Sequence, residues 1–87
     1  FPVEQLNQAI EAYDQAVTKA KASGADEFLP VYYTNRSAAL YLLGFCQLDP
    51  AARRLKFEQA EADALAATQT ARNYDLAWQA LGNAREA

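Results

Sequence analysis

Acidic side chains, one cysteine and one short basic run are the groups in this chain that could do chemistry. Glu11 and Asp14 could serve as acid and base only if their surroundings tuned them, and both fall on the polar face of an expected helix, where solvent covers them. Cys46 could act as a nucleophile only beside a cation that favours its thiolate form. The chain has no histidine, no glycine-rich phosphate loop, and no serine or cysteine with an activating base. We therefore expect no enzyme activity, no metal site and no cofactor.

The basic run comprises Arg53, Arg54 and Lys56, and it lies in the segment 45–56. These cations could form a dock for an acidic partner, or they could be a solvated helix face. We favour the solvated face because short charge runs usually have that role.

The net charge of −3 disfavours nucleic acid, whose binding needs clustered cations. No apolar run reaches the roughly 20 residues that span a bilayer, so we expect no membrane contact. A single cysteine allows no internal disulfide, which predicts a cytoplasmic location.

Alanine, which favours helix, is abundant, and glycine and proline, which disfavour it, together number six. We therefore expect helices to position these groups. We expect an all-α fold of four antiparallel helices over residues 3–22, 28–44, 50–72 and 75–86. Gly24 suits the end of the first helix, Pro30 the start of the second and Asp49-Pro50 the start of the third. The fourth helix is expected to bury Ala77, Trp78, Leu81 and Ala84. Residues 1–87 open on Phe1 without a methionine, so we expect one segment of a longer protein.

Two parts of the chain match later parts of the same chain. An offset of 51 residues places Ala9 on Ala60, and it also places Ala16 and Ala20 on alanines. An offset of 45 residues places Tyr33 on Trp78 and Ser37 on Gly82. Small residues at fixed points let helices approach closely, so the matches predict a helical repeat.

The segment Trp78-Gln79-Ala80-Leu81-Gly82 resembles the opening of a tetratricopeptide repeat (TPR), and Ala60 stands at the family's spacing before it. With a repeat of about 34 residues, insertions of about six and eleven residues account for both offsets. Four positions depart from the family pattern: Arg85 replaces an aromatic residue, Ala64 a phenylalanine, and Lys21 and Arg72 prolines.

The resemblance implies that the helices run second, first, second, first, so two apolar faces lack their usual cover. We expect either a longer parent protein or self-association as a homodimer or by helix swapping.

The segment Val31-Tyr32-Tyr33-Thr34-Asn35-Arg36-Ser37-Ala38 resembles the TPR helix of Hsp70 and Hsp90 co-chaperones. That resemblance implies a clamp of cations and amides on the carboxylates of a peptide tail. Asn35 matches one clamp position, but Leu76 and Ala80 replace the lysine and arginine of the third helix. We therefore predict that this segment does not bind a chaperone tail.

The leading hypothesis is a protein-interaction module that binds a peptide or a helix of a partner protein. The alternative is a structural helical bundle that self-associates through its uncapped ends. The family analogy places the groove on one face of the second and fourth helices, although Leu42 and Leu76 could instead pack on flanking helices. The expected peptide-binding residues are Val31, Thr34, Asn35, Ala38, Tyr41, Leu42, Leu76, Gln79, Ala80 and Asn83.

Overall fold

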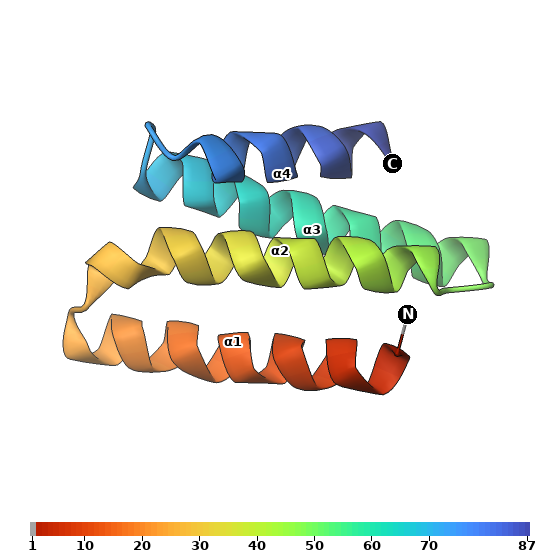
Figure 1. The fold of residues 1–87 in the computed structure, drawn as a ribbon, viewed down its shortest axis with the longest axis horizontal. Helices are drawn as coiled ribbons and strands as arrows, with labels where there is room; N and C mark the ends of the chain where they lie inside the picture. Colours follow the sequence, from red (N-terminus) through yellow and green to blue (C-terminus); the bar gives the residue numbers. More distant parts are fainter. Residues whose placement is uncertain (1) are drawn as a thin grey trace.

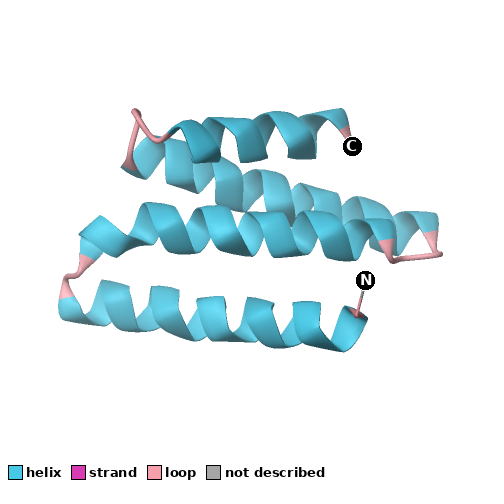
Figure 2. Cartoon of the chain, viewed as in Figure 1, coloured by secondary structure: helices cyan, strands magenta, loops and turns pink. Residues whose placement is uncertain are grey.

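The computed structural model describes residues 2–87 and contains four α-helices in that range (Figure 1). They are α1 (Val3–Ser23), α2 (Leu29–Phe45), α3 (Pro50–Thr70) and α4 (Asp75–Glu86), and a short 3₁₀ turn, η1 (Asp26–Phe28), precedes α2. Short loops join successive helices, which run in alternating directions (Figure 2). The expected all-α, antiparallel array is confirmed.

The predicted helix starts and stops are largely confirmed. Gly24 ends α1 with a left-handed φ of 74°, and its N–H donates to the carbonyl of Ala20. Asp49 caps α3 by accepting a hydrogen bond from the N–H of Ala52 at 3.1 Å. The third helix ends at Thr70, two residues before its approximate expected end, because Ala71 leaves the helical region with φ −144° and ψ 97°.

Small residues bring α2 and α3 together. Ala60, Ala64 and Ala67 of α3 are all 0% exposed. The hydroxyl of Ser37 donates to the carbonyl oxygen of Ala60 at 2.7 Å, and both groups are buried. The small size of both side chains permits this close approach, as the internal sequence match predicted for small residues at fixed points.

An ion cluster made of Arg36, Asp14 and Asp63 joins three helices. Arg36 of α2 donates from Nε and Nη2 to both carboxylate oxygens of Asp63 in α3, each at 2.7 Å. Its Nη1 donates to Asp14 of α1, also at 2.7 Å. The hydrogen bond to Asp63 is the main reason that the pKa of Arg36 lies above its usual value, while burial opposes that shift. Asp14 stays more than half exposed, as expected of a polar helix face, and its ion pair with Arg36 is a contact that the sequence did not predict.

Tyr33 lies in the core beneath this cluster. The Arg36 guanidinium carbon is 5.6 Å from the centre of its ring, and Lys21 Nζ is 5.7 Å from it. The ring is 9% exposed and shares a cluster with Val17 of α1 and Ala67 of α3. Tyr33 therefore links α1, α2 and α3 through apolar and cation–π contacts.

Trp78 corrects the prediction for α4. Ala77, Leu81 and Ala84 are buried as expected, but Trp78 is 51% exposed. Its indole N–H donates to the carbonyl of Arg72 at 2.8 Å. The ring lies beside the buried face of α4 and not within it, because Trp78 is turned by about 100° from Ala77.

Candidate functional site

An uncharged stripe runs along one face of α2. Val31, Asn35, Ala38 and Leu42 follow one another at spacings of four, three and four, which aligns them on one side of a helix. Val31 and Ala38 are exposed, whereas Asn35 and Leu42 are half-buried. No neighbouring helix covers this line fully within residues 2–87.

The same pattern continues on α4, which packs against α2. Leu76, Ala80 and Asn83 lie 45 residues after Val31, Asn35 and Ala38. Leu76 is 55% exposed, and Gln79 and Asn83 are also exposed. We call the two lines together the uncharged stripe: Val31, Asn35, Ala38 and Leu42 of α2 with Leu76, Ala80 and Asn83 of α4.

Thr34 and Tyr41 were predicted to lie on the peptide-binding surface, but the structure places both of them away from the open face. Thr34 is only 6% exposed, and its hydroxyl oxygen has no hydrogen-bond partner. It precedes Asn35 by one residue, and a step of about 100° carries it off the open face. Tyr41 is half-buried in an aromatic cluster, with its ring 4.9 Å from Phe45 and 5.7 Å from Phe57 between centroids. The main role of Tyr41 is therefore to pack against Phe45 and Phe57.

Phe45 is a residue of this surface that the sequence reasoning missed. It follows Leu42 by three residues, so it prolongs the line on α2, and it is 51% exposed. The spacing was visible in the sequence. It was overlooked because Phe45 was assigned to the segment 45–56 rather than to the helix before it.

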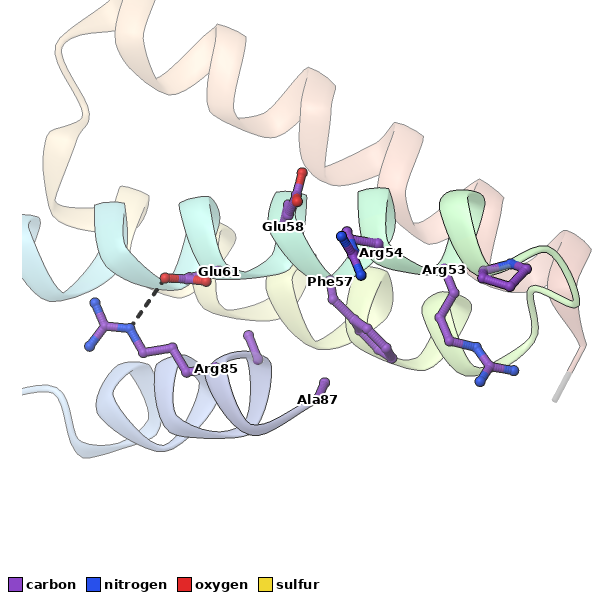
Figure 3. Close-up of a pocket in the computed structure, with 9 residues that line it drawn as sticks. Arg53, Arg54, Phe57, Glu58, Glu61, Arg85 and Ala87 are labelled. Atoms are coloured by element: carbon purple, nitrogen blue, oxygen red, sulfur yellow. Dashed lines mark hydrogen bonds and ion pairs between the residues drawn. The ribbon is translucent and has the colours of Figure 1, made fainter.

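The basic run lies near a hollow between the start of α3 and the end of α4, whose lining residues Figure 3 draws as sticks. Arg53 is held by the carbonyl of Gln47, to which Nη2 donates at 3.0 Å. Arg85 donates to Glu61 at 3.3 Å across the two helices. Glu58 also lines the hollow. Carboxylates thus offset the cations, and the arrangement is that of a mixed, solvated face.

Cys46 is half-buried at the end of α2. Its thiol donates to the carbonyl of Leu42 at 3.5 Å, which occupies the group in a contact within its own helix turn.

Between residues 2 and 87, none of the helices combines the length and the apolar character that crossing a membrane requires. No family model, curated protein or solved structure matches this chain. The geometry of the uncharged stripe therefore carries the functional argument.

Proposed function

We propose that this chain is a TPR-like, non-catalytic scaffold of the cytoplasm that binds an apolar peptide or amphipathic helix of a partner protein along the uncharged stripe. The observation that carries the proposal is the exposure of Val31 and Leu76 at equivalent places on two neighbouring helices. The burial of Ala60 and Ala67 and the contact of Ser37 with Ala60 support the TPR-like interpretation, because these small residues lie at the fixed points of the internal repeat.

The chemistry of the stripe selects the class of ligand. Its members are aliphatic or carry a neutral amide, so they offer no cation to a terminal carboxylate. An amphipathic helix could place its apolar side chains on Val31, Leu42 and Leu76, while Asn35 and Asn83 bond to its polar edge. From Val31 to Phe45 the line on α2 is about 21 Å long at 1.5 Å per residue, which matches about four turns of a bound helix.

A selection from a library of displayed helical peptides tests the proposal. The wild-type chain is the bait, and each selected peptide is then titrated against Leu76→Lys and Leu65→Lys. Leu65 is the matched control, because it is an exposed leucine on α3 at 38% exposure, outside the stripe. We expect Leu76→Lys to weaken binding at least tenfold, since it places a charge against an apolar ligand, and Leu65→Lys to leave it unchanged.

Two results would contradict this function. One is a library that yields no saturable binder. The other is a set of binders that lose affinity equally with both substitutions, because their site would then lie off the stripe.

A second candidate, a structural bundle that self-associates, is favoured by a different observation. Trp78 exposes half of its surface on a side of α4 that no other described element covers. Tryptophan is enriched where proteins contact one another, because its ring supplies a large apolar area together with a polar N–H. Association of the purified chain with itself supports this candidate whether or not peptides bind.

A further inference from the structure

One side of α4 is open where the equivalent side of α2 is covered. Trp78 is 51% exposed, and a Cβ added at Gly82 would meet nothing within 4 Å. Their counterparts 45 residues earlier, Tyr33 and Ser37, are 9% and 1% exposed, because α3 packs on Ser37 and residues of both α1 and α3 pack on Tyr33. The side of α4 that carries Trp78 and Gly82 thus repeats a helix-packing surface without its partner.

The small residues of α1 repeat those with which α3 receives α2. Ala9 and Ala16 lie 51 residues before Ala60 and Ala67, which are 0% exposed in α3. Ala9 and Ala16 are only half-buried. Ala16 also lines a hollow of about 380 Å³ beside Phe28. The small residues of α1 therefore repeat the α3 surface that receives α2.

We propose that α4 of one copy packs on α1 of a second copy in the way that α2 packs on α3 within a single chain. In this arrangement Gly82 lies against Ala9 of the second copy, as Ser37 lies against Ala60. Trp78 enters the hollow beside Ala16 of the second copy, as Tyr33 shares a cluster with Ala67. The inference specifies the geometry of the second candidate, self-association, and it does not depend on peptide binding.

The α2–α3 contact contains an ion pair, and both of its members are uncharged at the equivalent positions of α4 and α1. Arg36 of α2 corresponds to Leu81 of α4, and its partner Asp63 of α3 corresponds to Ala12 of α1. Because both members change together, the contact between copies leaves no unpaired charge at these two positions. A single unmatched charge would have opposed it, since an unpaired buried charge is costly.

The two surfaces differ, so the contact is head-to-tail. Each copy keeps a free α1 at one end and a free α4 at the other, and association extends into a row or closes into a ring. The uncharged stripe stays accessible, because Leu76 and Trp78 are two residues apart and point about 200° apart around α4.

Two substitutions that block opposite ends test this geometry. Gly82→Gln extends a side chain from the open side of α4, where an added Cβ meets nothing within 4 Å. Ala9→Gln does the same on α1, and Ala22→Gln is its control, since Ala22 is exposed elsewhere on α1. The readout is sedimentation velocity over a concentration series that reaches the millimolar range, with circular dichroism to verify that each variant stays helical.

We expect the mass of the wild type and of Ala22→Gln to rise with concentration. Each blocked variant should sediment as a 9.6 kDa monomer. An equimolar mixture of the two should form a dimer and stop there, because it offers one intact α4 and one intact α1 surface per pair.

Other outcomes overturn the proposal in distinguishable ways. Association that survives Gly82→Gln or Ala9→Gln, or a mixture that stays monomeric, refutes the head-to-tail contact while self-association stands. A wild type that is monomeric throughout refutes both the contact and the second candidate. Neither result bears on peptide binding.

Discussion

Replacing Arg36 by leucine should destabilise the chain more than any single change in its two acidic partners. The substitution leaves the Asp63 carboxylate, whose side chain is 12% exposed, without its two hydrogen bonds. Removing one partner of a fully buried pair costs about 3–5 kcal/mol, and the 19% exposure of the Arg36 side chain reduces this to about 3 kcal/mol. A chain of this length is expected to have a stability of about 4–13 kcal/mol, so the loss is a large fraction of the total.

A double-mutant cycle measured by urea denaturation isolates the interaction. Arg36→Leu and Asp63→Leu are compared singly and together, and we expect the pair to cost about 2 kcal/mol less than the sum of the singles, since neither charge is then left alone. Asp14→Asn should cost less than about 1 kcal/mol, because the Asp14 side chain is 56% exposed and solvent screens it. Additive single effects, or equal losses for Asp14 and Asp63 variants, would refute the reasoning.

The coupling energy should not change from neutral pH to about pH 10. The hydrogen bond from Arg36 to Asp63 holds the pKa of Arg36 above its usual value, so folding favours the charged form. A raised pKa contributes stability that is complete below the unfolded-state pKa and is lost as the pH rises through the folded-state pKa, and both lie well above pH 10. A coupling that falls in mildly alkaline solution would show that Arg36 is not the group that carries it.

Three further changes probe how α2 and α3 fit together. Gly44→Ala should destabilise the fold by about 1 kcal/mol, because its Cβ would lie 2.6 Å from the Phe57 ring and the overpacking outweighs a gain of about 1 kcal/mol in helix propensity. In a Phe57→Leu background the same change should stabilise the fold. Denaturation of the wild type, the two single variants and the double variant tests both expectations. Ser37→Ala removes the buried hydrogen bond to Ala60 and should cost about 1 kcal/mol by the same measurement, whereas a neutral result would mean that size alone matters at this position. Asp49→Ala removes the cap of α3 and should cost about 1 kcal/mol with a matching drop in thermal midpoint, and an unchanged midpoint would show that this helix end frays in the folded chain.

The parts of the fold that the sequence predicted depend on local chemistry. Gly24 and Asp49 mark helix ends because one residue supplies the left-handed φ or the capping oxygen. The internal offsets predicted that small residues such as Ala60 and Ser37 let helices approach closely, and the hydrogen bond between these two residues shows such an approach. Val31 and Leu76 of the stripe were predicted from the resemblance to the TPR family.

The ion cluster escaped prediction because its members are far apart in the sequence. Asp63 lies 27 residues after Arg36, and nothing near either residue indicates the partner. Trp78 was misjudged for another reason. Its residue type predicts burial, but exposure depends on which element packs beside it, and no described element lies on that side of α4.

The position of α1 at the edge of the molecule sets an order for local opening. The backbone of α1 approaches η1 and α2, whereas α2 lies close to α1, α3 and α4 (Figure 1). An element with neighbours on one side can detach while the rest stays folded, so the amide hydrogens of α1 should exchange with solvent sooner than those of α3. Detachment of α1 breaks the ion pair between Asp14 and Arg36. If a second copy covers the free side of α1, protein concentration will slow that exchange, and the motion of one helix will then report on assembly.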